Sequence, residues 1–374
     1  MIIGIPKETK DQEARVGMTP KYVKKLVDQG HSVVIQKGLA NLAGIPDDEY
    51  IAAGASVVNT MNDVYEKATM IVKFKDYMVG EYDVPIRKDH IIWCFFHLGE
   101  NEPDHIITNK MIDSKATGLA YEMLQASDGT RPVMVPMSEI AGKLTTIIAA
   151  NLCLLPNGGA GVCPTAITGS KRPKYIIIGG GHAGYGAAKI AEAFDADVTV
   201  FEAFQSRRLY LRDNLPKSEI LTYDVDLINE MALDCDVLIN AIYPYPGMPV
   251  PVIPRATIKK MKQGAVVMDL AGTNILETMR YTTISEPTYI EEGVVHYGVD
   301  NMPSMVCKTS TDAFLQTTYP YIEAIANKGL KKACEESEVL SKAMNFYNGQ
   351  VVNKDVGITH GVPWVDFDPA MIDE

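Results

Sequence analysis

Residues 176–184 read Ile-Ile-Ile-Gly-Gly-Gly-His-Ala-Gly, a β-branched run followed at once by glycines at positions 179, 181 and 184. Apolar residues then recur on one face of a predicted helix over 187–194. A strand, a tight glycine turn and a helix in this order predict a dinucleotide-binding motif. The glycines permit the turn, the close approach of the backbone to a pyrophosphate, and close packing of helix on strand. Gly179, Gly181 and Gly184 are therefore the predicted cofactor-binding residues. The alternative is a glycine turn with only a structural role.

The next predicted strand, over 197–201, is followed by Glu202. An acidic residue about 20 positions after the glycines is placed to hydrogen-bond the 2′-hydroxyl of a ribose, and it would repel a 2′-phosphate. We therefore predict NAD rather than NADP as the cofactor. Arg207 and Arg208 lie nearby in the sequence and weaken that preference without reversing it. His182, inside the turn, is interpreted as a turn residue rather than a catalyst.

The rest of the chain alternates short apolar runs with helical patterns, the order typical of parallel α/β proteins. We predict strands over 2–5, 32–36, 70–74, 91–96 and 118–121, and a second series over 175–178, 197–201, 236–239, 265–270 and 294–299. A long helix is expected over 138–154, and a largely helical tail after residue 310. At 374 residues the chain is long enough for two domains, each with its own core.

Composition narrows the classes of partner. The net charge of −12 argues against a nucleic acid or an anionic membrane as partner, because both are negatively charged. The six cysteines are scattered without a C-x-x-C pair, so we expect buried free thiols in a reducing compartment and no metal site. The N-terminus lacks the apolar core of a signal peptide, and no apolar run approaches the roughly 20 residues that cross a bilayer. A cytoplasmic location is expected.

A second set of polar residues belongs to the first half of the chain. At or just after the ends of predicted strands stand Arg15, Lys73, Lys75, His97 and Glu122. The carboxyl ends of parallel strands meet at one edge of a sheet, where ligands bind in open α/β folds. The sequence therefore predicts a site at this edge.

The residue types suit chemistry on a small organic acid. Arg15 could hold a carboxylate through a bidentate fork. Lys75 could donate to a carbonyl oxygen and stabilise charge that develops there. His97 could pass a proton at neutral pH, where histidine ordinarily titrates. Taken singly, each of these residues is more often a solvated surface charge or, for the histidine, a core residue.

At this point the sequence resembles the alanine dehydrogenase and nicotinamide-nucleotide transhydrogenase family. The matching motifs are IPKETK at 5–10, EARVGMTP at 13–20, MIVKFK at 70–75, FHL at 96–98, AYE at 120–122, PMSEIAG at 136–142, IGGG at 178–181, NMP at 301–303 and TST at 309–311. They run in order over nearly the whole chain, which makes the resemblance specific.

The resemblance implies two Rossmann-like, doubly wound domains with the active site in the cleft between them. Residues 1–135 with 310–374 would form the substrate and catalytic domain, and residues 136–309 the NAD(H)-binding domain. A small amino or keto acid substrate and a homo-oligomer, hexameric or dimeric, are also expected. Together with the strand-end positions, the resemblance gives the expected site: Arg15, Lys75, Glu122 and Asn301 for the substrate, His97 and Lys75 for catalysis, and Ser138, Glu202 and Asn301 beside the glycines for the cofactor.

One segment departs from the family pattern. Alanine dehydrogenases carry an Ala-Ile-Asp-Gln-Gly-Gly-like segment whose Asp is catalytic, whereas this chain reads Asp269-Leu-Ala-Gly-Thr-Asn, with Thr273 or Asn274 at the position of that Asp. The leading hypothesis is an amino acid dehydrogenase that performs reductive amination and oxidative deamination. The first alternative is an opine- or saccharopine-type dehydrogenase, which joins a keto acid to the amino group of an amino acid. The second is a non-catalytic NAD(H)-binding subunit like that of transhydrogenase.

Overall fold

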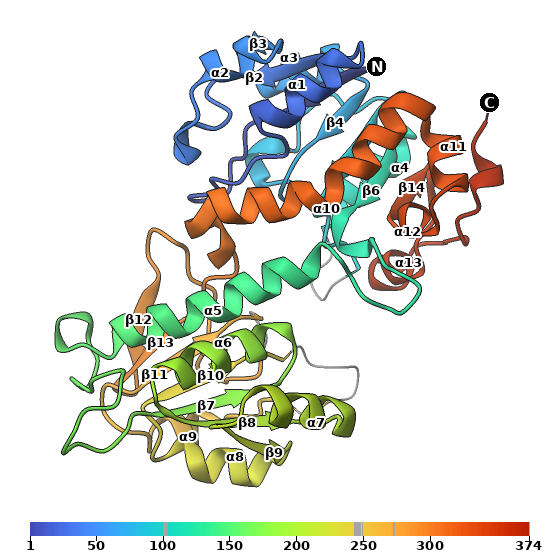
Figure 1. Cartoon of the computed structure of the whole chain (residues 1–374). Coiled ribbons are helices and arrows are strands. Elements are labelled where there is room, and N and C mark those ends of the chain that lie inside the picture. Colours follow the sequence, from blue (N-terminus) through green and yellow to red (C-terminus); the bar gives the residue numbers. More distant parts are fainter. Residues whose placement is uncertain (100–103, 243–247, 249, 272–273, 374) are drawn as a thin grey trace. The chain divides into compact units, whose positions relative to one another are not determined.

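The computed structural model of the protein describes residues 1–99, 104–242, 248, 250–271 and 274–373. The chain divides into two compact units (Figure 1): unit 1 comprises Met1–Pro136 and Ser304–Glu374, and unit 2 comprises Met137–Pro303. The return to unit 1 therefore comes at Ser304 rather than at residue 310. Each unit is built on one largely parallel sheet flanked by helices, so the predicted two-domain α/β class is confirmed.

Unit 1 contains an eight-stranded sheet with the order β15-β14-β6-β5-β4-β1-β2-β3. The neighbours among β1 to β6 pair in parallel, whereas β14 pairs antiparallel with both β6 and β15. The strands are β1 Ile2–Ile5, β2 Ser32–Gln36, β3 Ser56–Val58, β4 Met70–Val72, β5 Ile91–Cys94, β6 Thr117–Ala120, β14 Met344–Tyr347 and β15 Gln350–Val351. Because β4 ends at Val72 and β5 at Cys94, earlier than predicted, Lys73, Lys75 and His97 lie in the loops beyond these strands.

Helices cover the unit 1 sheet (Figure 1). They are α1 Pro20–Asp28, α2 Asp47–Ala52, α3 Met61–Lys67, α4 His105–Ser114, α10 Cys307–Lys328, α11 Leu330–Glu335, α12 Glu338–Ser341 and α13 Lys354–His360, with short 3₁₀ turns at Asn41–Ala43, Val79–Glu81, Tyr121–Met123 and Pro369–Met371. α1 begins at Pro20, since proline suits a first helical turn, where its missing N–H would have no helical acceptor.

The C-terminal tail is helical over α10, α11, α12 and α13, as predicted, but not continuously. Two short strands, β14 and β15, form there, and β14 pairs with β6 through Met344 opposite Leu119. Such short strands carry little local signal. They are stabilised by pairing with a strand far earlier in the sequence, which a single-sequence pattern does not show.

Unit 2 contains a seven-stranded sheet with the order β12-β13-β11-β10-β7-β8-β9, in which only the edge pair of β12 and β13 is antiparallel. The strands are β7 Lys174–Ile178, β8 Asp197–Glu202, β9 Glu219–Thr222, β10 Val237–Asn240, β11 Val266–Asp269, β12 Thr288–Glu291 and β13 Val294–Tyr297. The helices are α6 His182–Ala193, α7 Gln205–Asn214, α8 Val225–Ala232, α9 Arg255–Ile258 and most of α5 Met134–Leu152, with a 3₁₀ turn at Leu155–Asn157. A further 3₁₀ turn, Met302–Val306, begins in unit 2 and ends in unit 1.

Both faces of the unit 2 sheet are buried. Along β7, Tyr175 and Ile177 belong to one apolar cluster, and Ile176 and Ile178 belong to another. Successive side chains of a strand point to opposite faces, so the sheet has a core on each side. This explains why β7 reads as a continuous apolar run in the sequence, as parallel strands covered on both faces do.

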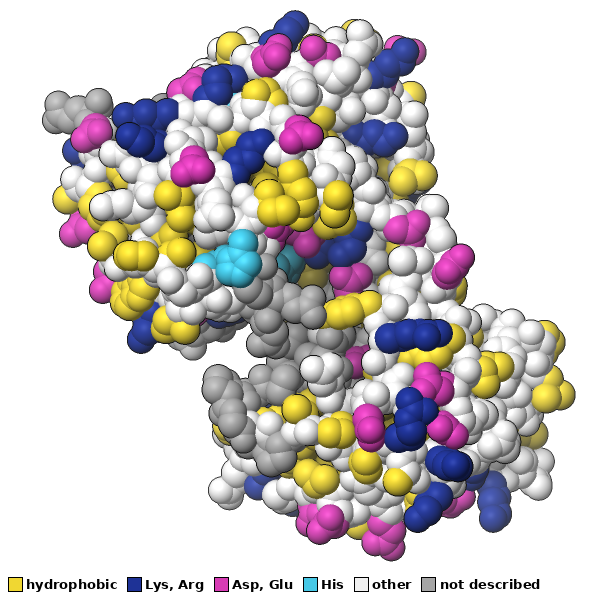
Figure 2. Space-filling view, turned by 180° about the vertical axis from the view of Figure 1, so that it is seen from behind, with side chains coloured by type: hydrophobic (Ala, Val, Ile, Leu, Met, Phe, Trp, Pro, Cys, Tyr) yellow, Lys and Arg dark blue, Asp and Glu magenta, His cyan; other side chains and the backbone are white. Residues whose placement is uncertain are grey.

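The surface carries both signs of charge. On the face shown in Figure 2, Lys and Arg side chains are interspersed with Asp and Glu. Within the described part of the chain, no helix combines the length and apolar character needed to cross a membrane. All six cysteines are free thiols, but Cys163 is exposed and Cys307 half-buried, so the expectation of buried thiols is wrong for these two.

Candidate active site

Four of the expected substrate and catalytic residues come after four neighbouring strands of unit 1. Arg15, Lys75, His97 and Glu122 come after β1, β4, β5 and β6, and these strands lie side by side in the order β6-β5-β4-β1. Since all four strands run parallel, their carboxyl ends share one edge of the sheet. These four residues therefore follow strand ends at one edge of the sheet, as the sequence predicted.

The two lysines after β4 have different surroundings. Lys73 is fully buried, and its Nζ donates to Glu8 Oε2 at 2.6 Å and lies 3.2 Å from Glu81 Oε2. The Nζ of Lys75 forms an ion pair with Asp76 Oδ1 at 3.7 Å, which is too far for a hydrogen bond. Among the described residues, none accepts a hydrogen bond from Lys75 Nζ. The ammonium of Lys75 can therefore bind a ligand, whereas that of Lys73 is committed to the protein.

Arg15 is buried, and Glu13 and Phe74 are among the residues that hold it in place. Its Nε and Nη2 donate to the two carboxylate oxygens of Glu13 at 2.7 and 2.5 Å, and its guanidinium lies over the ring of Phe74, 4.4 Å from the centroid. Burial alone would raise the pKa of Glu13, but the hydrogen bonds and charge of Arg15, helped by Lys75, lower it instead. Glu13 is thus ionised at neutral pH and occupies one edge of the guanidinium.

His97 occupies a left-handed backbone conformation, with φ of 52°, which is uncommon for a residue with a side chain. Its backbone N–H donates to Glu122 Oε1 at 2.6 Å, and its ring stacks on Phe95 with centroids 5.6 Å apart. Glu122 is buried. The structure therefore gives Glu122 a contact that holds the His97 loop, in addition to the substrate contact expected for it.

Asp76, which the sequence analysis did not single out, lies among these groups. Burial favours the neutral form of Asp76, but the charges of Lys75, Lys10 and His97 outweigh it and lower its pKa. Lys75 and His97 are therefore both near enough to act electrostatically on one carboxylate. Its position directly after Lys75 was the available sequence signal.

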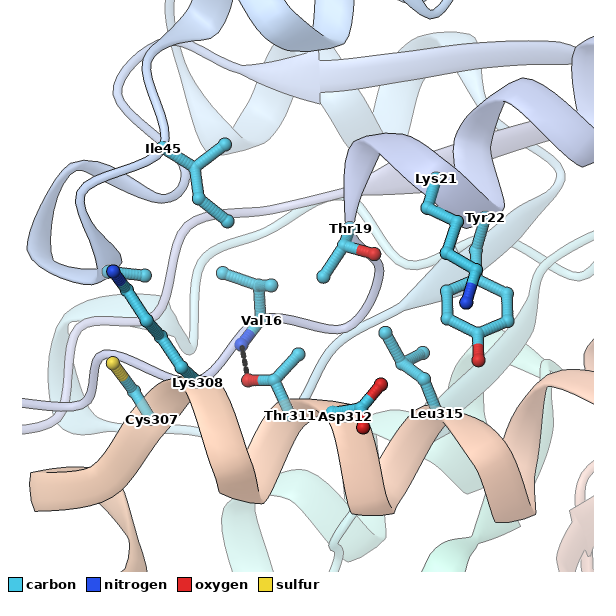
Figure 3. Close-up of a pocket in the computed structure, with 11 residues that line it drawn as sticks. Val16, Thr19, Lys21, Tyr22, Ile45, Cys307, Lys308, Thr311, Asp312 and Leu315 are labelled. Carbon is cyan, nitrogen blue, oxygen red and sulfur yellow. Dashed lines mark hydrogen bonds between the residues drawn. The ribbon is translucent and has the colours of Figure 1, made fainter.

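A cavity of about 180 Å³ lies on another side of the Arg15 segment (Figure 3). It is lined by α1, by α10 and by the loop at Ile45, and Val16 N donates to Thr311 Oγ1 there at 3.4 Å. Its lining does not include Arg15, Lys75 or His97. It is therefore separate from the polar edge described above.

The glycine turn of unit 2 follows β7. Gly179 has φ of +96°, and a Cβ there would lie 2.3 Å from Ile242 Cγ2. A Cβ on Gly184 would lie 1.8 Å from the carbonyl oxygen of Gly179, so α6 packs directly on the turn. Gly181 caps α6, and a Cβ there would meet no atom within 4 Å. Packing within the protein therefore requires glycine at 179 and 184, whereas the space beside Gly181 is open to a ligand.

Glu202 at the end of β8 is buried and bound to this turn. Its Oε2 accepts from Gly180 N and its Oε1 from Phe204 N, each at 2.8 Å. Arg207 donates to the carbonyl oxygens of Gly180 and Gly181 at 2.6 and 3.2 Å. Glu202 therefore binds a backbone N–H of the glycine turn, and Arg207 binds two of its carbonyl oxygens.

Arg208 also donates to backbone carbonyls, those of Glu202 and Ala203. Ser138 is half-buried on α5, one turn before Gly142. A Cβ on Gly142 would lie 1.9 Å from Ala183 O, so this part of α5 contacts the start of α6. Residues four apart on a helix share a face. Ser138 therefore lies on the face of α5 that meets the glycine turn.

Other strand ends of unit 2 carry buried polar groups. Asn301, beyond β13, is 4% exposed. Asn240 and Asp269, at the ends of β10 and β11, are joined by a 3.0 Å hydrogen bond from Asn240 Nδ2 to Asp269 Oδ1. Neither residue was predicted to belong to the site, although both end parallel strands.

The structure gives no contacts for the two residues at the position of the family's catalytic Asp. Thr273 lies outside the described residues, and Asn274 is exposed. In the described part of the chain, no group of three or more His, Cys, Asp or Glu side chains is arranged to hold a metal ion.

Comparison with known proteins assigns the family. The model of the alanine dehydrogenase/PNT N-terminal domain matches residues 4–141, and that of the C-terminal domain matches residues 145–354. The chain belongs to the alanine dehydrogenase/PNT family. The family inferred from the sequence motifs is therefore confirmed.

Members of this family resemble the chain over its full length. It is 36% identical to an alanine dehydrogenase of Methanococcus maripaludis, covering 99% of this chain and 100% of that protein. It is also 36% identical to an alanine dehydrogenase of Geobacillus stearothermophilus, over 98% of each. A solved L-alanine dehydrogenase structure superposes with a TM-score of 0.88 at 35% identity, covering 96% of this chain and 99% of the other.

Proposed function

We propose that this protein is an NAD-dependent amino acid dehydrogenase that converts pyruvate and ammonia to alanine and catalyses the reverse oxidative deamination. The observation that carries the proposal is the Lys75 ammonium, which has no hydrogen-bond acceptor among the described residues, at the sheet edge it shares with Arg15 and His97. A lysine so placed is suited to a ligand oxygen. The full-length similarity to alanine dehydrogenases supports this choice of substrate.

Each residue of the edge then has a role. Lys75 donates to the keto oxygen and stabilises the negative charge that develops there as ammonia adds to the carbonyl carbon. His97 transfers the proton needed for that oxygen to leave as water. Arg15 binds the substrate carboxylate through its guanidinium, which Glu13 and Phe74 hold in position. When bound, NADH would supply the hydride for the substrate carbon that has lost its oxygen.

The glycine turn fits a dinucleotide. The open space at Gly181 leaves room for a pyrophosphate beside the first turn of α6, whose N–H groups have no helical acceptor. Glu202 binds the adenosine ribose. Each of its oxygens accepts one backbone N–H and retains a second lone pair. We assign Ser138 and Asn301 to the nicotinamide and substrate side of this site. Unit 2 is accordingly the NAD(H)-binding domain and unit 1 the substrate domain. The expected interdomain cleft stays a prediction.

We also expect a homo-oligomer, a hexamer or a dimer, which light scattering of the purified protein measures. The cytoplasmic location remains a prediction from the sequence.

A substrate assay tests the function. The protein is given NADH with pyruvate and ammonium, and separately NADH with pyruvate or 2-oxoglutarate plus lysine, ornithine or arginine. Loss of NADH absorbance with ammonium alone is the expected result. Turnover only with an amino acid as the amine would favour the opine- or saccharopine-type reaction. Tight NADH binding without any turnover would indicate a non-catalytic binding subunit.

A further inference from the structure

Beneath the polar edge of unit 1 lies a buried cluster of charged groups. Glu8, Lys73 and Glu81 are 6%, 0% and 1% exposed. Lys73 Nζ contacts both carboxylates, at 2.6 Å to Glu8 and 3.2 Å to Glu81. Buried charges are costly unless they are paired and hydrogen-bonded. The cluster also forms hydrogen bonds with the backbone of the segment that carries Lys75.

Glu8 holds the backbone of the turn that carries Lys75. Its Oε1 accepts from Phe74 N at 2.7 Å, and its Oε2 accepts from Lys75 N at 3.2 Å. Lys73 Nζ donates to the carbonyl oxygen of Asp76, on the other side of Lys75, at 3.2 Å. Charge-assisted hydrogen bonds such as these are stronger than neutral ones. The turn is therefore fixed at three backbone groups, two before the Lys75 side chain and one after it.

Glu81 connects the same cluster to its surroundings. Its Oε1 accepts from Thr9 Oγ1 at 2.6 Å, and its Oε2 accepts from Met78 N at 3.1 Å. Glu8 and Thr9 belong to the segment after β1 that also leads to Arg15. The cluster therefore joins the loop that carries Arg15 to the loop that carries Lys75.

We propose that Glu8, supported by Lys73, is a positioning residue for the keto-acid reaction, because its carboxylate fixes the backbone on which the Lys75 side chain is mounted. That Glu8 affects catalysis rests on the proposed function. That Glu8 fixes the Lys75 backbone rests only on its hydrogen bonds. Neither Glu8 nor Lys73 touches the substrate. They act through Lys75.

The cluster also gives Glu8 a distinct pH signature. Burial raises the pKa of Glu8 to about 6, the Glu81 charge adds to this effect, and Lys73 opposes it. The titratable groups that face Glu8 are Lys73, Glu81, Tyr65 on α3, Cys94 on β5 and Tyr121 after β6. As pH falls through about 6, the Glu8 carboxylate takes up a proton. The protonated group has no negative charge to strengthen its hydrogen bonds with Phe74 N and Lys75 N. The hold on Lys75 should weaken over this range.

Glu8→Gln is the direct test. A carboxamide keeps the shape of the side chain but has a single acceptor oxygen, so its NH₂ group must face one of the present donors. Glu66→Gln is the matched control, because Glu66 is exposed on α3 in the same unit. Glu8→Ala, which removes both acceptors, repeats the test if the Gln variant does not fold.

The first readout needs no activity. Hydrogen exchange of the 72–77 segment, at a pH well above 6 where Glu8 is ionised, should be about tenfold faster or more in the Glu8 variant, which corresponds to the loss of a charge-assisted hydrogen bond. Exchange in Glu66→Gln should match the wild type. Unchanged protection in both Glu8 variants would overturn the inference, whatever the protein catalyses.

The second readout is kinetic. In Glu8→Gln, kcat/KM for the keto acid should fall by about tenfold or more, while the Kd for NADH, which unit 2 binds, stays within about twofold. The acid-side loss of activity near pH 6 should be smaller in the variant than in the wild type. A wild-type kcat/KM and pH profile in the variant would refute the positioning role. If the wild type had no dehydrogenase activity, the proposed function would fail, and the exchange data would decide the geometry of Glu8 separately.

Discussion

Replacing Gly184 or Gly181 of the glycine motif with alanine should affect different properties of the protein. The first change should lower stability, and the second should weaken NADH binding. At Gly184, a Cβ would lie 1.8 Å from the backbone oxygen of Gly179, so α6 must move away from the turn. Overpacking of this kind costs about 1–3 kcal/mol, and more when backbone must shift. At Gly181, φ is −61° and a Cβ would meet no atom within 4 Å, so alanine fits the free protein without strain.

Gly184→Ala should therefore lower the free energy of unfolding by about 3 kcal/mol, whereas Gly181→Ala should leave it unchanged. For NADH binding, Gly181→Ala is the informative variant. Its methyl group would fill space that we assign to the pyrophosphate, and the affinity should fall by about tenfold or more, since 1.4 kcal/mol corresponds to a factor of ten. Gly80→Ala is the control, because Gly80 in unit 1 also has open space around its Cβ position.

Urea unfolding and NADH fluorescence titration measure the two quantities. A Gly181→Ala variant that is stable and binds NADH as tightly as the wild type would refute the argument from the glycine turn to the cofactor. A Gly181→Ala variant that is destabilised would show that the space at this position is not open.

Three further predictions concern charged residues. Lys75→Ala should reduce kcat by about a hundredfold or more, because a donor to the developing oxyanion is lost, while the Kd for NADH stays unchanged; near-normal turnover would remove Lys75 from the mechanism. Glu202→Ala should lower the preference for NADH over NADPH, and equal discrimination by variant and wild type in paired KM measurements would contradict the ribose contact. Lys73→Met should destabilise the protein by about 3–5 kcal/mol, because it leaves two buried carboxylates without their cation. The loss should shrink as pH falls below about 6 and Glu8 becomes neutral, and urea unfolding across that range, with exposed Lys24→Met as control, checks this.

The sequence was informative wherever function depends on local spacing. The glycines at 179, 181 and 184 follow a strand and precede a helix, and the structure forms that strand, turn and helix in place. The α/β class could also be predicted, because parallel strands buried on both faces must be apolar throughout. Strand ends and the pairing in the tail were less accurate, because they depend on contacts between distant segments.

What the sequence determined by itself is the order of the elements that it placed and the residue types that stand at the strand ends, because these follow from the periodicity of buried side chains and from glycine geometry. It did not predict the short strands β3, β9, β12, β14 and β15. The strand-end pattern put Lys73 and Lys75, two equal charges two positions apart, at the same edge, and it gave no physical ground for choosing Lys75 over Lys73. Only the tertiary structure separated them, by folding Glu8 and Glu81 against one ammonium and leaving the other without an acceptor in the described part of the chain. The physical reason is that the cost of a buried charge depends on partners brought from elsewhere in the chain, and a local pattern contains no information about them.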